Sequence, residues 1–405
     1  MAGVPVQVSG LFSDAQREAL LALRRDLHAH PELAFHEHGT AARLRAALER
    51  IPGVEIQAVA GTGLVARVAG REHAAPVVAV RGDIDALPIQ EATGLSYAST
   101  NAGVMHACGH DVHATWAVAA AQLLAAEPAA GDVLIVLQPA EETGQGALAV
   151  LESGALDGVS CIFGGHVDRR FDVGKVVADA GPLAASTDRF TITMQGHGAH
   201  AARPHEAADP IVGAAALVSA LQTIVSRRLN PAVPGVVTVA TIHAGTASNV
   251  IPDDAVLTGT VRAVDAESRA FMLHEVRRVA ASCAATYGLA ATVTLDAGTP
   301  PLVNSARGAG WARAAAADVM GLTNVVPLGL TNLGGEDFAY YLERMDGCFL
   351  RIGAREAGGE STAAHSPRFV ADDGAIFCGA AVLAACARRA SADLAGRVER
   401  GAPKG

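Results

Sequence analysis

Three short apolar runs, each followed by polar residues, constrain the fold of this chain more than any other feature. The runs are Val77–Val80, Asp132–Leu137 and Cys161–Phe163. Their apolar residues are consecutive rather than alternating, as in strands that are buried on both faces. Such strands are typical of the central sheet of an α/β domain, and open α/β sheets bind ligands beyond the carboxyl ends of their strands. The sequence therefore predicts a buried sheet with a functional site at one edge.

Side chains that suit metal binding follow each run. Asp83 and Asp85 follow the first run, Glu141 and Glu142 the second, and His166 the third. Adjacent glutamates point in different directions, so one can bind a metal while the other accepts a proton near the substrate. Each motif also has an ordinary explanation, such as an Asx turn or a solvated glutamate pair at a helix start. Their recurrence favours a shared metal site, because every ordinary explanation would have to hold at once.

The segment Met105–His113 supplies further candidates. It holds three histidines, one cysteine and one aspartate in nine residues. Thiolates and imidazoles bind borderline transition metals, and the glycine between Cys108 and His110 permits the tight turn that brings both side chains to one ion. The apolar segment Ala114–Ala126 predicts a buried helix directly after it. The alternative is a structural cysteine with histidines that cap this helix.

The order of predicted elements indicates two domains. The chain has 405 residues, which exceeds what a single hydrophobic core usually supports. From Ser186 the pattern predicts elements in the order β-α-β-β-α-β, which is that of a ferredoxin-like unit. We predict an α/β domain made of residues 1–185 and 299–405, with a ferredoxin-like α+β domain inserted at residues 186–298. In the first domain, helices are expected at Asp14–Ala29, with Ser13 as N-cap, and at Ala306–Met320.

Composition excludes several classes of function. The chain carries 31 basic and 41 acidic residues, a net charge of −10, without a basic block, so nucleic acid is not an expected partner. Its 6 cysteines show no pairing rhythm, which favours reduced thiols in a cytoplasm. The N-terminus lacks the basic and apolar regions of a signal peptide, and the longest apolar runs fall short of a membrane span. We expect a soluble, cytoplasmic protein with no membrane partner.

Nine motifs, spread over nearly the whole chain, match those of a known family in the expected order. They are Arg25–Leu33, Gly82–Pro88, Met105–Asp111, Gln138–Glu142, Gly165–Val167, Gly196–His205, Ser248–Pro252, Gly335–Phe338 and His365–Pro367. With these motifs the chain resembles the M20 metallopeptidase family. It is most similar to the amidohydrolase branch, which includes hippurate hydrolases, auxin-conjugate hydrolases and N-acyl-amino-acid deacylases.

The resemblance implies a metal-dependent amidohydrolase that cleaves N-acyl amino acids or a related small amide through a metal-activated water. It implies two divalent metal ions, of which Zn and Mn fit the donor set best and Co and Ni can substitute. The positions that match the family's metal ligands are Cys108, His110, Glu142, His166 and His365. His106 and His113 then fall back to supporting roles, and Asp111 to a helix-start or supporting role.

The same resemblance implies the residues that act on the substrate. Glu141 matches the general base, and Asp85 matches an aspartate behind the metals. The inserted domain would act as a lid that supplies His200 to the developing oxyanion, in its own subunit or across the interface of a dimer or tetramer. Asn249 and Arg262 would hold the carboxylate of the substrate.

Two departures from the family pattern leave the substrate open. Asp168–Asp172 stands where this branch has a hydrophobic, proline-containing loop, and Thr143–Gly146 stands where relatives are richer in glycine. Both segments are expected beside the pocket, so a dipeptide or another small C–N substrate is an alternative. A second interpretation makes Cys108 a nucleophile activated by His106 or His110, and chelator treatment distinguishes it. A third is a non-catalytic ligand-binding relative.

Overall fold

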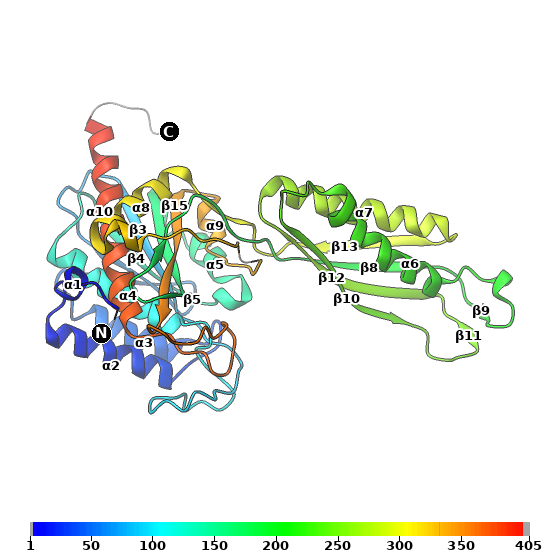
Figure 1. The fold of residues 1–405 in the computed structure, drawn as a ribbon, viewed down its shortest axis with the longest axis horizontal. Helices are drawn as coiled ribbons and strands as arrows, with labels where there is room; N and C mark the ends of the chain where they lie inside the picture. Colours follow the sequence, from blue (N-terminus) through cyan, green and yellow to red (C-terminus); the bar gives the residue numbers. More distant parts are fainter. Residues whose placement is uncertain (1–2, 332, 400–405) are drawn as a thin grey trace. The chain divides into compact units, whose positions relative to one another are not determined.

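The computed structural model describes residues 3–331 and 333–399, which form two compact units (Figure 1). The first unit contains the chain up to Gly181, the segment Asn304–Leu330 and the chain from Tyr340 onward. The second contains Pro182–Val303 and the short segment Thr331–Ala339. The second unit is therefore inserted into the sequence of the first.

A seven-stranded mixed sheet forms the centre of the first unit, with the order β1-β2-β4-β3-β5-β15-β6. Neighbours among β4, β3, β5 and β15 are parallel, and the outer pairs are antiparallel. The predicted α/β class is confirmed. The strands are β1 (Glu55–Val59), β2 (Gly63–Val68), β3 (Val77–Asp83), β4 (Val133–Gln138), β5 (Val159–Asp172), β6 (Val176–Val177) and β15 (Asp346–Arg355).

Helices α4, α8 and α10 pack on this sheet and on one another, with α10 contacting both others and strands β3, β5 and β15. Helix α2 packs against α4 and begins as the sequence predicts, because the Ser13 hydroxyl accepts a hydrogen bond from the backbone N–H of Gln16. The helices are α1 (Val6–Ser9), α2 (Asp14–Ala29), α3 (His38–Leu48), α4 (His110–Ala126), α5 (Gly146–Glu152), α8 (Ala306–Met320), α9 (Ala339–Leu342) and α10 (Gly374–Glu399).

One strand differs from the sequence-based expectation. We expected the third apolar run to end at Phe163, with His166 beyond the strand, but β5 continues through the two glycines to Asp172. The reason is its pairing with β15, in which Gly164 and Gly165 lie opposite Phe349 and Leu350. On the other side, β3 pairs with β5 only as far as Phe163. His166 therefore lies within β5, at a position that pairs with β15 but no longer with β3.

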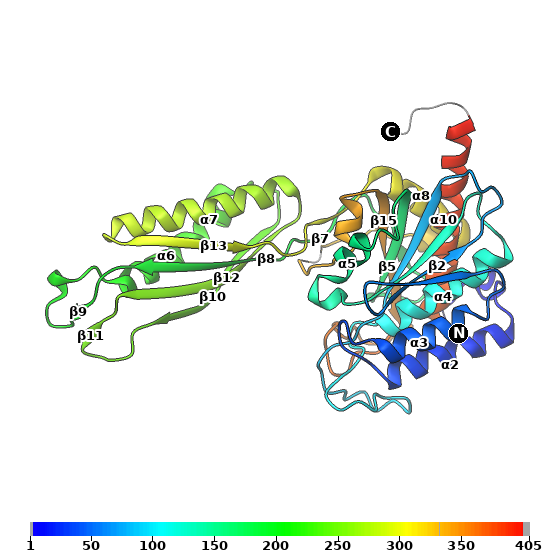
Figure 2. The same cartoon turned by 180° about the vertical axis from the view of Figure 1, so that it is seen from behind.

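The second unit is a four-stranded antiparallel sheet, β10-β12-β8-β13, covered on one face by α6 and α7 (Figure 2). Its own core includes Phe190, Leu257 and Met272. Two further short pairs, β9 with β11 and β7 with β14, complete it. The elements are β7 (Gly181–Ala184), β8 (Asp188–Gln195), β9 (Ala199–His200), α6 (Pro210–Thr223), β10 (Gly235–Ala244), β11 (Val250–Ile251), β12 (Asp254–Ala263), α7 (Ala266–Thr286), β13 (Ala290–Asp296) and β14 (Leu302–Asn304).

Within residues 3–331 and 333–399, two helical segments are long and apolar enough to cross a membrane, by length and composition alone. They are Pro210–Arg228 and Gly374–Arg397. The expectation that every apolar run is too short for a span was therefore wrong. The second segment belongs to α10, and 78% of its most apolar window is buried inside the protein, as in the core helix of a folded domain.

Candidate metal centre

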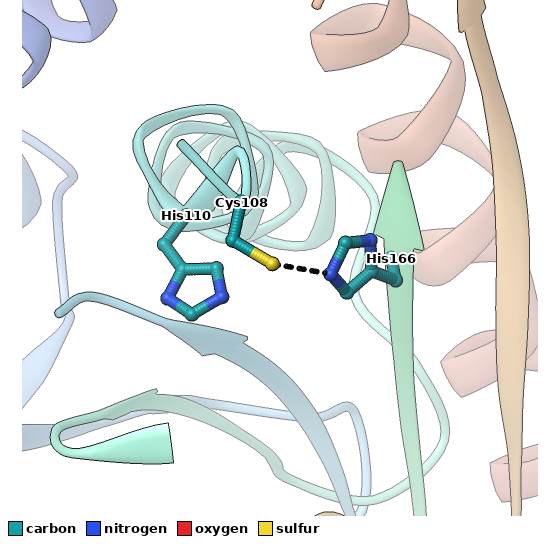
Figure 3. Close-up of side chains that lie close together, drawn as sticks. All are labelled: Cys108, His110 and His166. Carbon is teal, nitrogen blue, oxygen red and sulfur yellow. Dashed lines mark hydrogen bonds between the residues drawn. The ribbon is translucent and has the colours of Figure 1, made fainter. Parts of the chain in front are cut away.

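The candidate site lies at the carboxyl edge of strands β4, β3, β5 and β15. Cys108 lies on the loop that enters α4, His110 is the first residue of that helix, and His166 lies on β5. Figure 3 shows that these three side chains converge, and the Cys108 Sγ lies 3.1 Å from the Nε2 of His166. Residues from two separate parts of the fold, the start of α4 and strand β5, thus meet at one point.

Two glycines allow this convergence. Gly109, between Cys108 and His110, has φ 88° and ψ 18°, a left-handed conformation that glycine adopts without steric cost. Gly82 on β3 faces the first turn of α4, and a Cβ there would lie 2.4 Å from the backbone oxygen of His113. The helix can therefore start directly against the strand.

The glutamate pair is held by two buried carboxylates. Ala140 has φ 56°, unusual for a residue with a Cβ, and leads into the short 3₁₀ helix Glu141–Thr143. Glu37 accepts a hydrogen bond from the Ala140 N–H at 2.9 Å, and Asp85 accepts one from the Glu142 N–H at 3.0 Å. Sequence reasoning did not identify Glu37, because its partner lies 103 residues away and no local motif marks it.

His365 arrives on the loop that follows β15. Its φ is 65°, and its backbone N–H donates to the carbonyl of Ala107, next to Cys108. Its Nε2 lies 3.5 Å from the Oε1 of Glu142. Left-handed geometry at a residue with a Cβ costs about 1–3 kcal/mol, and such strain clusters at functional sites. Ala140 and His365 are both strained in this way, and both lie beside the glutamate pair Glu141 and Glu142.

Two of the site histidines, the buried His110 and the half-buried His166, are oriented by contacts at Nδ1. The His110 Nδ1 contacts Asp85 at 3.1 Å, and the His166 Nδ1–H donates to the carbonyl of Val167 at 2.7 Å. These contacts leave each Nε2 facing the site, as is usual for histidines that bind metals. The Nε2 of His110 and the Oε1 of Glu142 are buried and make no hydrogen bond to a described residue. Cations bound at the site would satisfy both atoms.

The electrostatics of the site also favour a cation. Burial and the nearby carboxylate of Glu142 raise the pKa of the Cys108 thiol well above its usual range. Burial alone would lower the pKa of His110, but Asp83 and Asp85 raise it overall. The raised pKa of His110 means that the buried carboxylates stabilise positive charge here. A metal ion would supply that charge and hold Cys108 as a thiolate, whereas a metal-free thiol nucleophile would be mostly protonated.

Two groups of three ligands share one sulfur atom. Cys108, His110 and His166 form one group, and Cys108, Glu142 and His365 form the other, with the ligand atoms of each within 4.8 Å of one another. The donor set of one thiolate, three imidazoles and one carboxylate suits two borderline divalent ions. Glu141 lies beside them, with its Oε2 3.9 Å from the Nε2 of His110.

A third group, formed by Asp83, His110 and His113, meets the same distance criterion, but Asp83 and His113 are already hydrogen-bonded. His113 contacts Asp83 through Nδ1 at 2.6 Å, and its Nε2 accepts a hydrogen bond from the Val167 N–H at 2.9 Å. Burial opposes ionisation of Asp83, yet Arg81 and the neighbouring histidines hold its pKa well below the usual range. Asp83 and His113 already bond to each other and to Val167, so of this group only His110 remains a candidate metal ligand.

Asp111 also belongs to the support of the site. Its carboxylate is buried, accepts a hydrogen bond from Arg24 at 2.8 Å and contacts the Nδ1 of His28 at 2.9 Å. His106 is buried nearby, and neither of its ring nitrogens makes a hydrogen bond to a described residue. Burial lowers the pKa of His106 to about 3, so this ring is neutral.

The remaining predicted site residues lie in the second unit. His200 on β9 pairs with Val250 on β11, and the Ala201 N–H donates to the carbonyl of Asn249 at 3.0 Å. The Nδ1 of His200 accepts from the Ala202 N–H, so the proton of the neutral ring is on Nε2, which can donate. His200 and Asn249 thus form one exposed cluster.

Arg262 lies elsewhere in the same unit. It is near the end of β12, opposite Val236, whereas β9 and β11 lie beyond the start of that strand at Asp254. Eight residues of extended strand span roughly 27 Å. Burial and the neighbouring Arg189 lower the pKa of Arg262. The structure therefore does not bring Arg262 together with His200 and Asn249 in a single subunit.

Comparisons with known proteins point to one family. The model of a family described as peptidase family M20/M25/M40 matches residues 79–389. An N-acetyl-L-cysteine deacetylase of Bacillus subtilis is 42% identical over 388 residues, which cover 95% of this chain and 90% of that protein. The IAA-amino acid hydrolase ILR1-like 5 of Arabidopsis thaliana is 37% identical, over 91% of this chain and 86% of that protein.

A solved structure agrees with these sequence matches. The YXEP protein of Bacillus subtilis, described as a dinuclear metal binding peptidase from the M20 family, superimposes with a TM-score of 0.84 at 38% sequence identity. The match covers 94% of this chain and 99% of that one. The fold is thus that of a protein described as binding two metals.

Proposed function

Since the chain belongs to peptidase family M20/M25/M40, we propose that it removes the acyl group from small N-acyl amino acids, using two divalent metal ions. The general activity, metal-dependent hydrolysis of C–N bonds in N-acyl compounds, follows from the similarity of the chain to a deacetylase and an amino acid conjugate hydrolase. The observation that carries the proposal is the pair of ligand groups that share Cys108.

Two ions bound there would supply Lewis-acid activation of a water and of the substrate carbonyl. Glu141 lies beside both ligand groups and has a side chain that is 11% exposed, so it can reach both that water and the substrate. Its carboxylate takes the proton of the attacking water and passes it to the leaving nitrogen. The products are the free acid and the amine. Asp85 orients His110 and the Glu142 backbone rather than meeting the substrate.

The donor set narrows the choice of metal. A thiolate among imidazoles and a carboxylate fits Zn, while Mn, Co and Ni accept the same ligands. We propose Zn or Mn as the resident ions. Metal analysis of protein purified without added ions tests this choice.

The second unit acts as a lid in this proposal. The Nε2–H of His200 would donate to the developing oxyanion, and Asn249 and Arg262 would hold the carboxylate of the substrate. In a small N-acyl amino acid these two groups are only a few ångströms apart. Because His200 and Arg262 lie far apart within one unit, we propose that the His200 cluster serves the active site of a second subunit.

Exposed apolar residues support such a dimer. Ile211 and Val212 on α6, Ile242 on the edge strand β10 and Val250 on β11 are each at least 44% exposed. An uncharged edge strand of this length is a template for pairing with another copy. A mixing experiment tests the arrangement. Glu141→Gln and His200→Ala subunits, each inactive alone, should regain activity when mixed, and a mixture that stays inactive would contradict transfer between subunits.

The cellular compartment is part of the proposal. All six cysteines are free thiols, and five of them are buried. Unpaired cysteines in a chain of this size favour a reducing compartment, so we propose the cytoplasm.

The decisive experiment separates the base from the metal ligands. Glu141→Gln should lower kcat by at least about 1000-fold while metal content stays at two ions per chain, because Glu141 acts on the proton and not on the ions. N-acetyl, N-benzoyl and indole-acyl amino acids, together with dipeptides, form the substrate panel. Wild-type rates in the variant would refute the assigned base, and full activity after chelation would favour Cys108 as a nucleophile.

A further inference from the structure

Arg169 is the residue whose surroundings the sequence did not anticipate. It lies in the segment Asp168–Asp172, where the family pattern departs, and we expected that segment beside the pocket. Instead, the Arg169 side chain is only 5% exposed and contacts the loop that follows β15. This loop, residues 356–370, carries His365.

The guanidinium of Arg169 joins both ends of that loop. Its Nη1 donates to Glu356 Oε2 at 2.9 Å, to the carbonyl of Val370 and, at 3.4 Å, to the carbonyl of Ala354. Its Nη2 donates to the carbonyl of Glu360 at 2.6 Å and to Glu356 Oε1 at 3.3 Å. Every acceptor lies on the loop or within two residues of its start.

This pattern of donors requires arginine. The planar fork contacts a carboxylate and carbonyls in several directions at once, whereas a lysine ammonium is a single point of charge. The Glu356 carboxylate neutralises the buried cation, and the Arg169 hydrogen bond lowers the pKa of that carboxyl. Arg169 and Glu356 together therefore close the base of the loop.

The tip of the loop has fewer restraints. The His365 side chain is 53% exposed, and its backbone is in the left-handed region. Near the tip, the His365 N–H donates to Ala107 O, and the Ala92 N–H donates to Pro367 O. A loop closed at its base has less conformational freedom to lose when its tip is fixed, so less free energy is spent on ordering His365.

We propose that Arg169 is a positioning residue that presents His365 to the ion held by Cys108, Glu142 and His365, and that it leaves the ion at Cys108, His110 and His166 unaffected. The proposal rests on the two-metal site of the proposed function. The selectivity for one ion follows from the contacts of Arg169. Among the described residues, its side chain bonds the loop 356–370 and Ala354 just before it. His110 and His166 are instead oriented by Asp85 and Val167.

Metal binding tests the proposal without using activity. Wild type, Arg169→Lys, Arg169→Met and Glu356→Ala would be dialysed against buffered Co²⁺, and bound metal per chain measured by elemental analysis and visible absorption. The Arg169 variants should bind one ion about 10–100-fold more weakly and the other with wild-type affinity, the range seen when groups that orient metal ligands are removed. The thiolate–Co²⁺ absorption should persist, because Cys108 still binds the retained ion.

Controls distinguish positioning from general damage. Arg355→Met is the matched control, because Arg355 pairs with Asp172 at 2.7 Å at the start of the same loop and does not reach its far end. It should bind both ions normally. Glu356 is 53% exposed, so its alanine variant should fold and weaken the same single ion by a smaller factor.

Loss of both ions together in folded Arg169 and Glu356 variants, or retention of both, would overturn the proposal. Failure of the wild type to bind any metal would refute the proposed function instead.

Discussion

Gly109→Ala offers a quantitative test of how α4 begins. Gly109 has φ 88°, and a Cβ there would lie 2.5 Å from the Cγ2 of Val167, a buried residue on β5. The left-handed backbone costs an alanine about 1 kcal/mol after allowance for the stiffer unfolded chain. Overpacking against Val167 adds about 1–3 kcal/mol. We expect the free energy of unfolding to fall by about 2–4 kcal/mol.

Two further variants separate these contributions. Gly103 has a similar φ of 75°, and nothing lies within 4 Å of a Cβ placed there, so Gly103→Ala should cost only about 1 kcal/mol. Val167→Ala removes the Cγ2 atom that the new Cβ at position 109 would approach. In that background Gly109→Ala should therefore also cost about 1 kcal/mol, a coupling that a double-mutant cycle measures directly.

The assay can be confined to the first unit. The chain has 2 tryptophans, Trp116 and Trp311, and both lie in that unit, so selectively excited tryptophan fluorescence during urea unfolding follows it alone. Metal-depleted protein keeps changes in ion affinity out of the measurement. If Gly109→Ala cost no more than Gly103→Ala, or were equally costly with and without the Val167 side chain, the steric reasoning would be refuted.

Three other perturbations address the support of the site and the second unit. Glu37→Leu removes the acceptor of the Ala140 N–H. Since Asp85 still holds Glu142, metal content should be kept while kcat falls about 10–100-fold, and unchanged kinetics would argue against this role. Arg24→Met deprives the buried Asp111 of its guanidinium partner. The free energy of unfolding in urea should fall by about 3–5 kcal/mol, and a fall of less than about 1 kcal/mol would contradict this role. In the second unit, the Arg278 hydrogen bond lowers the pKa of Glu275 from 4.5 to about 2. The ionised form therefore stabilises the fold above the unfolded-state pKa, and this contribution is lost as pH falls from about 4.5 toward 2. Urea midpoints at pH 5.5 and 3, followed by circular dichroism, should drop further in wild type than in Glu275→Gln, and equal drops would contradict the assignment.

Elements with local signals could be predicted from the sequence. Helix α2 begins and ends where predicted, at Asp14 and Ala29, because a serine cap and apolar periodicity are encoded within a few residues. Helix α8 also matches, at Ala306–Met320. The buried strands were recognisable because consecutive apolar residues require cover on both faces.

Features that depend on distant partners could not be predicted. The extension of β5 past its glycines depends on pairing with β15, almost 200 residues later. Glu37 and Arg169 have no motif of their own, since their partners include backbone groups of remote loops. The predicted ligands Cys108, His110, Glu142, His166 and His365 do come together, but their roles, like those of His200, Asn249 and Arg262, stay predictions until metal and kinetic measurements are made.

The late position of β15 and His365 in the chain sets the order in which this protein can mature. During synthesis, β3, β4, α4 and the whole second unit emerge before β15, the strand that pairs with β5, and before His365, the last predicted metal ligand. Domains fold as they emerge, whereas contacts of long sequence separation form late. A chain that ends before His365 can therefore hold the full set of predicted ligands for at most one ion. The second ion can be acquired only after synthesis of the chain is nearly complete, so truncated products should not become active hydrolases.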